Sequence, residues 1–299
     1  MKIGFIGLGT MGGSIARCLV DGGHDVTIND LRMDAGDDLI KLGAKWGANP
    51  KILAQNCDAV ITSLPGPVQM QEVVLNRDIG ILAGLKPGSV YIDMTTNAPS
   101  VFRKVATECF AKGVEVLDAP VSGRPPGMTI MVGGRTDTFK KYEAMLSCMA
   151  KNLVYVGELG QGMIAKLMTQ YMGYTYQVAV AEAFIIAAKA GVDVRILSQL
   201  IPISAGRGNI ENLQRQIFER TFEKDEAYPS RSYNVIAKDL TEACEFAQQI
   251  AAPAFTGLMA KEIYIRAEAQ GWANPLSMVR ILEQMAGFTV RVNPPKTIE

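Results

Sequence analysis

Residues 2–12 of this chain read KIGFIGLGTMG, and this stretch decides the fold of the first half. The apolar run Ile3–Ile6 is typical of a buried strand, and a helix over about residues 11–21 leads from it to a second strand, Asp25–Asn29. The glycines at positions 7, 9 and 12 have the spacing G-x-G-x-x-G. Between a strand and a helix, this spacing predicts a turn that binds the pyrophosphate of a dinucleotide.

Each glycine of the motif has its own physical role. Gly7 permits the tight turn, and Gly9 lets the backbone approach the pyrophosphate. Gly12 lets the helix pack close to the sheet, with its positive N-terminus facing the phosphates. The expected cofactor-binding turn is the whole motif, namely Gly7, Leu8, Gly9, Thr10, Met11 and Gly12.

Asp30 follows the second strand, 23 positions after Gly7. A carboxylate there accepts hydrogen bonds from the ribose hydroxyls of adenosine and repels the 2′-phosphate of NADP, so the sequence favours NAD. Arg32 keeps NADP open as an alternative, because a guanidinium can bind that phosphate. As an ordinary surface arginine, Arg32 would have no such role.

The first half alternates apolar strands with helix-length segments, which predicts a mostly parallel sheet covered by helices on both faces. The expected strands are Ile3–Ile6, Asp25–Asn29, Ala59–Ser63, Ser89–Asp93, Glu115–Asp118 and Met128–Val132. Ligands bind beyond the carboxyl ends of parallel strands, so Leu64, Pro65 and Thr96 are candidates for contacting the cofactor. These residue types also favour ordinary turns, which is the alternative.

The pattern changes near Gly157, and after Gly160 the chain reads as helical almost to its end. The expected helices are residues 163–190, 193–202, 208–220, 234–250, 254–270 and 275–286. The first is long and mostly apolar, as expected of a helix between two domains. We therefore expect an α/β Rossmann domain over residues 1–160, followed by an all-α domain over residues 161–299.

Composition narrows the range of functions. The 299 residues include 30 basic and 30 acidic side chains without a basic cluster, which argues against a nucleic-acid partner. No apolar stretch approaches the roughly 20 residues that span a bilayer, and no signal peptide is visible, so no membrane partner is expected.

The five cysteines form no C-x-x-C pair, which favours reduced thiols in the cytoplasm. The one histidine, His24, lies in a glycine turn, so neither a histidine base nor a metal site is expected.

With no histidine base, a lysine is the best candidate for moving a proton. Lys166 lies near the start of the long apolar helix, between Ala165 and Leu167. Burial there would lower its pKa toward neutrality, as an acid/base lysine requires, whereas the alternative is a surface lysine with a partly covered stem. Gln170 is one helical turn further on the same face, where it could donate to a substrate oxygen or face solvent.

Four stretches in this order and spacing resemble the β-hydroxyacid dehydrogenase family, which includes 3-hydroxyisobutyrate dehydrogenase and tartronate semialdehyde reductase. They are residues 4–12 (GFIGLGTMG), residues 118–123 (DAPVSG), residues 160–162 (GQG) followed by Lys166, and residues 238–240 (KDL). The resemblance spans nearly the whole chain. It implies a Rossmann domain and an all-α domain of the 6-phosphogluconate dehydrogenase type, joined by a long helix.

The resemblance also implies an activity, namely NAD(P)-dependent oxidation of an alcohol β to a carboxylate, or reduction of the matching semialdehyde. Ser122 and Gly123 would bind the substrate carboxylate, and Lys166 would be the acid/base. Thr96 and Lys238 would contact the nicotinamide half of the cofactor. We expect a homodimer or homotetramer acting on a small anionic substrate.

Three positions depart from the usual pattern of that family. Arg124 begins a shorter and stiffer loop, Gln170 stands where Asn is usual, and Arg231 stands where Phe is usual. We therefore expect Arg124 and Arg231 to bind a second anionic group on the substrate, because a guanidinium binds an oxyanion at two points. The alternative is that each pairs with a protein carboxylate such as Glu211 or Glu223, or points to solvent.

Two other functions stay open at this point. The same scaffold could serve an NADPH-dependent reductase of a carbonyl or an imine. A non-catalytic sensor or scaffold that binds a dinucleotide is the other alternative. Lys166 argues against the second alternative, while the altered loop and Gln170 keep it open.

Overall fold

The computed structural model describes residues 1–204 and 251–287, together with residues 206, 208, 217, 219–224, 236, 240–241, 244–245, 247–248 and 289. The chain divides into two compact units, residues 1–172 and residues 173–299. We describe each unit by itself.

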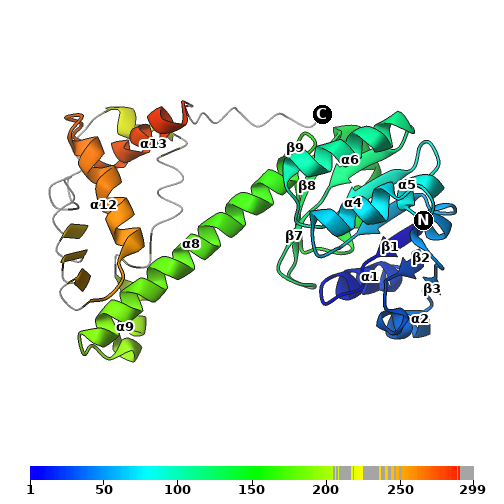
Figure 1. Ribbon diagram of the computed structural model, residues 1–299, viewed down its shortest axis with the longest axis horizontal. Helices are drawn as coiled ribbons and strands as arrows, with labels where there is room; N and C mark the ends of the chain where they lie inside the picture. The colour runs from blue at the N-terminus through cyan, green and yellow to red at the C-terminus, as the bar shows by residue number, and fades with distance from the viewer. Residues whose placement is uncertain are drawn as a thin grey trace. The chain divides into compact units, whose positions relative to one another are not determined.

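The first unit is built on a nine-stranded sheet of order β3-β2-β1-β4-β5-β6-β8-β7, in which β9 pairs with β8 (Figure 1). The strands are β1 Lys2–Ile6, β2 Asp25–Asn29, β3 Lys45–Trp46, β4 Ala59–Thr62, β5 Val90–Asp93, β6 Glu115–Asp118, β7 Val121–Ser122, β8 Thr129–Gly134 and β9 Asn152–Gly157. Neighbours among β1–β6 are parallel, whereas β8 runs antiparallel to β6 and β7. The expected mostly parallel sheet is confirmed, and its 3-2-1-4-5-6 order is that of a doubly wound dinucleotide-binding fold.

Alternate residues of the central strands enter two separate cores, one on each face of the sheet. In β4, for example, Ala59 and Ile61 belong to one core and Val60 to the other. The first core is covered by α1 (Gly12–Asp21), α2 (Asp37–Lys41) and α7 (Thr136–Ser147). The second is covered by α3 (Pro50–Ala54), α4 (Pro67–Leu75), α5 (Ile81–Gly84) and α6 (Pro99–Ala111). Burial on both faces explains why these strands read as continuous apolar runs.

Three strands are not apparent from the sequence. The two-residue strands β3 and β7 are too short to show any periodicity. Strand β9 is paired only with β8 and is partly exposed, so its apolar pattern is weak. Strand β8 also continues past the expected end at Val132, through Gly133 and Gly134.

A buried carboxylate holds the segment that follows β5. Asp93 has no exposed surface, and its Oδ1 accepts hydrogen bonds from the Thr62 hydroxyl at 2.9 Å and the Thr95 N–H at 3.0 Å. Its Oδ2 accepts from the Asn97 amide at 2.6 Å. The Thr95 hydroxyl in turn accepts from the N–H of Leu64 at 3.0 Å, which ties the loops after β4 and β5 together. Burial raises the pKa of Asp93 to about 6, although these hydrogen bonds oppose the rise.

The second unit begins within α8 (Gln161–Lys189), and its described elements are helical, as expected. They are α9 Val194–Leu200, the 3₁₀ turns Ile201–Ile203, Thr221–Lys224 and Pro275–Ser277, α12 Phe255–Glu268 and α13 Met278–Ala286. Ala267 and Ile281 form a small core between α12 and α13. The helices expected over residues 208–220 and 234–250 lie mostly outside the described residues. Within the described part of the chain, no helix combines the length and apolarity needed to cross a bilayer.

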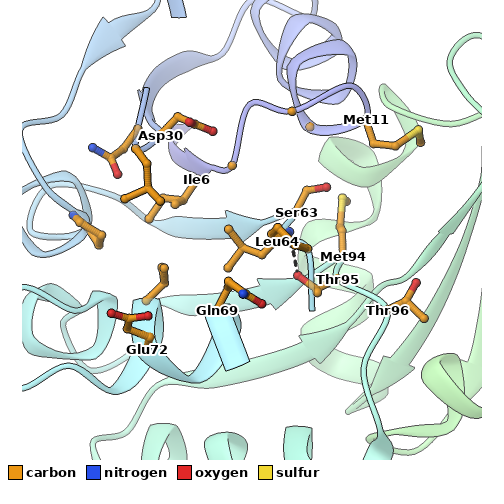
Figure 2. A pocket seen from close by; sticks show the side chains of 18 of the residues that line it. Ile6, Met11, Asp30, Ser63, Leu64, Gln69, Glu72, Met94, Thr95 and Thr96 are labelled. Atoms are coloured by element: carbon orange, nitrogen blue, oxygen red, sulfur yellow. Dashed lines mark hydrogen bonds between the residues drawn. The ribbon is translucent and has the colours of Figure 1, made fainter. Parts of the chain in front are cut away.

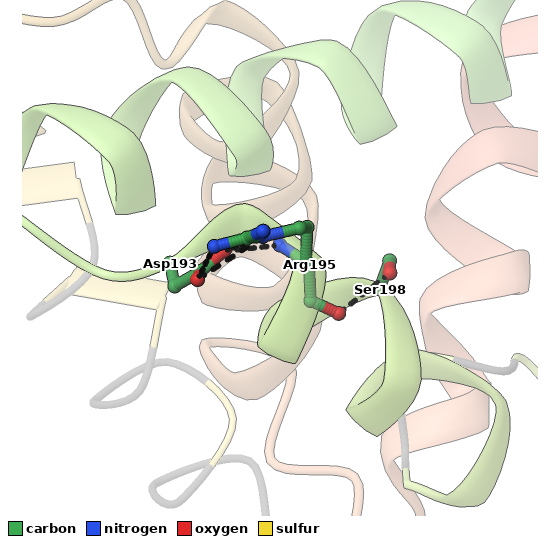
Figure 3. A network of polar contacts seen from close by, with 3 residues as sticks. All are labelled: Asp193, Arg195 and Ser198. Atoms are coloured by element: carbon green, nitrogen blue, oxygen red, sulfur yellow. Dashed lines mark hydrogen bonds and ion pairs between the residues drawn. The ribbon is translucent and has the colours of Figure 1, made fainter.

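Two arginines of the second unit form ion pairs of similar length at different depths. Arg220 donates to both carboxylate oxygens of Glu283 at 2.8 and 3.0 Å, and the two side chains are only 13% and 9% exposed. Arg195 donates to Asp193 at 2.7 Å, near Ser198, and is 86% exposed (Figure 3). Removing one partner of a buried pair costs about 3–5 kcal/mol, whereas an exposed pair contributes about 0–1 kcal/mol.

We expect Arg220→Met to lower the free energy of unfolding by about 3 kcal/mol or more, because it leaves the Glu283 carboxylate buried without this partner. The matched control, Arg195→Met, should lower the free energy of unfolding far less, because water screens this exposed pair. Urea denaturation followed by circular dichroism measures both. Equal losses would show that burial does not set the contribution of these ion pairs.

The raised pKa of Asp93 also predicts how stability depends on pH. The folded protein holds the Asp93 proton up to about pH 6, whereas the carboxyl ordinarily loses it near 3.8. The contribution of Asp93 to stability is therefore full below about pH 4 and falls by about 3 kcal/mol as the pH rises through 6. Between pH 4 and 7, the free energy of unfolding should decline less steeply for Asp93→Asn than for wild type. The exposed control Asp78→Asn should keep the wild-type slope, and identical slopes for all three proteins would contradict the assignment.

Candidate active site

A cleft of about 810 Å³ lies in the first unit, beyond the carboxyl ends of several parallel strands. Gly7 follows β1, Asp30 follows β2, Leu64 lies beyond β4 and Met94 follows β5, and all of them line the cleft. The expected site residues among its lining are Gly7, Gly9, Thr10, Met11, Gly12, Asp30, Leu64, Pro65, Thr96, Gly123 and Lys166. The fold thus gathers these residues from six separate stretches around one space, as the chemistry of a cofactor enzyme requires.

The glycine turn has the shape that a pyrophosphate needs. Gly7 has a φ of +94°, and a Cβ there would press against the carbonyl of Ser63. A Cβ at Gly12 would overlap the carbonyl of Gly7, so α1 can approach the turn only because position 12 is glycine. A Cβ at Gly9 would meet nothing within 4 Å, which leaves open space over the backbone. No side chain caps the first turn of α1, and the N–H of Gly13 there bonds to the carbonyl of Gly9 at 3.0 Å, so an anion at this turn would meet the positive end of the helix rather than a capping side chain.

Asp30 joins the glycine turn to the end of β2. Its Oδ2 accepts from the N–H of Leu8 at 2.7 Å, and its Oδ1 accepts from the N–H of Arg32 at 2.9 Å. Each carboxylate oxygen can accept a further hydrogen bond, so ribose hydroxyls can still bind there. The side chain of Leu8 is part of the core and does not line the cleft, whereas the exposed Arg32 does line it.

The far wall of the cleft comes from the loops after β4 and β5 and from α4. Figure 2 shows Leu64, Thr95 and Thr96 on this wall, with Gln69 and Glu72 of α4 nearby. The position of Thr95 depends on the buried carboxylate of Asp93. Sequence reasoning missed Gln69 and Glu72, because a polar residue on a surface helix carries no signal of its own.

Lys166 lies on α8, in the part of that helix that belongs to the first unit, and lines the cleft. It is only 7% exposed, and burial lowers its pKa. Within the described part of the chain it makes no ion pair. A buried amine of this kind releases its proton more readily than an ordinary lysine, which suits an acid/base. Gln170, one turn further on, is half-buried and does not line the cleft.

A second buried carboxylate, Asp118 at the end of β6, lies beneath the start of α8. It accepts hydrogen bonds from the N–H of Gly160 at 2.7 Å and from the N–H of Met163 at 2.8 Å. Burial raises the pKa of Asp118, and the N–H groups act in the opposite direction. The sequence analysis did not predict a role for Asp93 or Asp118. A charged residue at the end of a buried apolar strand is a pattern that could have indicated one.

The loop after β7 reaches the cleft in part. Val121 and Gly123 line it, Gly123 with a φ of +77°, whereas Ser122 is half-buried and outside the lining. Val121 and Ser122 are successive residues of β7 and therefore point to opposite sides, whereas Gly123 lies beyond the strand, where its positive φ turns the chain. Arg124 is exposed and outside the lining, and Glu223 pairs with Arg220.

Arg231 and Lys238 lie outside the described residues, as does Glu211. In the part that is described, no cluster of three or more His, Cys, Asp or Glu residues could hold a metal ion.

Comparison with known proteins adds independent information. Residues 2–157 match the family model described as the NAD binding domain of 6-phosphogluconate dehydrogenase. Residues 160–282 match the model for NAD-binding of NADP-dependent 3-hydroxyisobutyrate dehydrogenase. The chain is 33% identical over 279 residues to an uncharacterized oxidoreductase of Bacillus subtilis, covering 91% of this chain and 94% of that protein. It is 31% identical over 279 residues to the mitochondrial 3-hydroxyisobutyrate dehydrogenase of Homo sapiens, covering 91% and 83%.

Solved structures share the fold at lower identity. An imine reductase from Myxococcus stipitatus in complex with NADP⁺ has a TM-score of 0.84 at 14% identity, covering 94% of this chain and all of that one, 100%. A reductive aminase from Aspergillus terreus in complex with NADPH and ethyl levulinate has a TM-score of 0.78 at 20% identity, covering 94% and 99%. At these identities the likeness concerns the fold alone.

The two family models together cover most of the chain, and the relatives at 31–33% identity extend over 91% of it. With a dinucleotide-binding turn and an open cleft at the carboxyl ends of the parallel strands, the protein belongs to the β-hydroxyacid dehydrogenase family and is an NAD(P)-dependent oxidoreductase.

Proposed function

We propose that this protein oxidises a small 3-hydroxy acid, or reduces the matching semialdehyde, with Lys166 as the acid/base. The observation that carries the proposal is a buried lysine that lines the same cleft as the glycine turn and the Thr95–Thr96 loop. Human 3-hydroxyisobutyrate dehydrogenase, at 31% identity, supports this class of substrate.

When bound, the nicotinamide supplies the hydride chemistry. The part of this chain is to orient the substrate and to move one proton. In the oxidation, the hydroxyl proton passes to the neutral amine of Lys166 as the hydride leaves the carbinol carbon. In the reduction, the ammonium returns the proton to the carbonyl oxygen. Because burial lowers the pKa of Lys166, a larger fraction of the amine is neutral at a given pH than for an ordinary lysine.

For the substrate carboxylate we propose the Ser122–Gly123 backbone and hydroxyl, of which Gly123 lines the same cleft as Lys166. We further propose that the substrate carries a second anionic group. Arg124 follows directly and is exposed, and within the described residues it makes no ion pair, so its guanidinium is available to an oxyanion. Arg231 and Lys238 keep their expected roles as proposals.

The test is a screen of small 3-hydroxy acids, 3-hydroxyisobutyrate among them, as matched monoanions and dianions, followed by absorbance of the reduced cofactor. Lys166→Ala should lower kcat about 100-fold or more, because a general acid/base contributes at least that much, while the Kd of NADH stays near wild type. The control Lys104→Ala removes an exposed lysine from α6 and should leave kcat unchanged.

Residual activity of Lys166→Ala within about tenfold of wild type would refute the acid/base role. A higher kcat/KM for every monoanion than for its dianion would refute the second anionic group. No turnover with any of these acids would instead favour a dinucleotide sensor or scaffold.

Asp30 should set a preference for NAD over NADP. A hydrogen bond to a charged group is worth about 1.5–3 kcal/mol, so Asp30→Asn should lower the NAD to NADP ratio of kcat/KM by about tenfold or more. The control Asp34→Asn changes an exposed carboxylate four positions further along the chain and should keep the wild-type ratio. Equal or reversed use of the two cofactors by the wild-type protein would show that Arg32 outweighs the carboxylate, and would favour an NADPH-dependent reductase.

A further inference from the structure

The start of α8 is held by a carboxylate that belongs to the sheet. Asp118, with no exposed surface, accepts the N–H of Gly160 on Oδ1 and the N–H of Met163 on Oδ2, at 2.7 and 2.8 Å. The N–H of Gly162 also stabilises its charge. The first N–H groups of a helix have no partner within the helix, so one buried side chain satisfies several of them. Its negative charge also complements the positive end of the helix.

The packing around this carboxylate leaves room for nothing else. A Cβ at Gly133 of β8 would lie 2.5 and 2.8 Å from the two Asp118 oxygens. A Cβ at Gly162 would lie 2.9 Å from Oδ2 and 3.0 Å from the N–H nitrogen of Gly133. A side chain at Gly162 would also overlap the carbonyl of Met131 in β8, and one at Gly133 would press on the carbonyl of Glu158, so the carboxylate and the neighbouring backbone together require glycine at both positions. The helix start, β6 and β8 are therefore in direct contact through Asp118.

Lys166 lies one helical turn beyond this contact. Met163 and Lys166 are three residues apart on the same helix face, separated by about 4.5 Å along the axis. A helix transmits a displacement of its first turn along its length, because every turn is hydrogen-bonded to the next. Lys166 itself has no ion pair with a described residue to hold it. Its depth in the cleft therefore depends on how the first turn is held.

We propose that Asp118 is a positioning residue for Lys166, which sets the depth of the amine in the cleft by fixing the first turn of α8. The inference rests on the proposed role of Lys166 as acid/base. Asp118 does not line the cleft. Its neighbour in the sheet, Asp93, accepts hydrogen bonds from a different set of groups and holds the Thr95–Thr96 loop of the cleft.

The consequence for chemistry is a change in the pKa of Lys166. Asp118→Asn keeps the size of the side chain but turns an amide NH₂ toward one of the two N–H donors, so the first turn must shift. Lys166 then loses part of the burial that lowers its pKa, and the pKa should rise toward its ordinary value. Loss of the carboxylate charge would act in the opposite direction, but burial is what lowers the pKa of Lys166 in the folded protein, so burial decides the sign.

The first measurement needs no substrate. Acetylation of Lys166 by acetic anhydride, followed by mass spectrometry as a function of pH, reports the pKa of the amine. We expect a midpoint at higher pH in Asp118→Asn than in wild type. The control Asp137→Asn, an exposed carboxylate in the first turn of α7, should keep the wild-type midpoint. An unchanged or lower midpoint in Asp118→Asn would overturn the proposal.

The second measurement uses the full enzyme with NAD and the best acid of the screen. Asp118→Asn should lower kcat about 10- to 100-fold, the loss expected from misplacing a catalytic group, while the Kd of NADH changes less than about twofold. Gly162→Ala displaces the same turn with the carboxylate intact and should reproduce the loss. Should Asp118→Asn fail to fold, Gly162→Ala takes its place in both measurements.

A double variant separates the two proposals. If Asp118 acts through Lys166, Asp118→Asn should lower kcat no further in a Lys166→Ala background. A further loss of the same size as in wild type would overturn the positioning role and leave Lys166 as acid/base. An active Lys166→Ala protein would refute the acid/base role, while the acetylation midpoint would still decide whether Asp118 sets the depth of Lys166.

Discussion

In a parallel sheet all strands end at the same edge, and this constraint organises the whole candidate site. The chain returns to that edge after β1, β2, β4, β5 and β6, and each time it leaves a different group there. The glycine turn follows β1 and the carboxylate of Asp30 follows β2. Residues that are far apart in the sequence share one cleft because the crossovers between parallel strands all pass over the faces of the sheet.

Three carboxylates end or follow these strands, and their burial separates their roles. Asp30 is partly open, lines the cleft and can still accept hydrogen bonds from a ligand. Asp93 and Asp118 have no exposed surface and accept only from the protein. A buried carboxylate that accepts several N–H groups fixes the backbone around it, because each of those groups would otherwise lack a partner. The two buried carboxylates thereby hold two walls of the cleft, the Thr95–Thr96 loop and the start of α8.

The buried amine of Lys166 links this arrangement of carboxylates to the proposed proton transfer. The pKa of a lysine in an apolar environment is lowered only if the surrounding structure prevents the amine from reaching water. The described structure provides no ion partner for the amine, so the helix backbone must hold it in place. Asp118 holds the helix by accepting the N–H groups of Gly160 and Met163. Because these contacts are made to the backbone, a change of side chain at Lys166 would leave them in place.

The sequence by itself determined the fold class, the dinucleotide turn and most strands of the sheet. These features depend on local patterns, such as G-x-G-x-x-G spacing and apolar runs buried on both faces, which any window of the chain displays. It also singled out Asp30, Thr96 and Lys166, each of which lines the cleft.

Tertiary structure alone decided the other features of the site. The two-residue strands β3 and β7 exist only because a neighbour pairs with them, and Val121 lines the cleft while Ser122 does not because successive residues of β7 point to opposite sides. The contact of Asp118 with Gly160 and Met163 joins residues more than 40 positions apart. No local pattern carries such a contact, because it forms only when packing brings the end of a strand under the start of a helix.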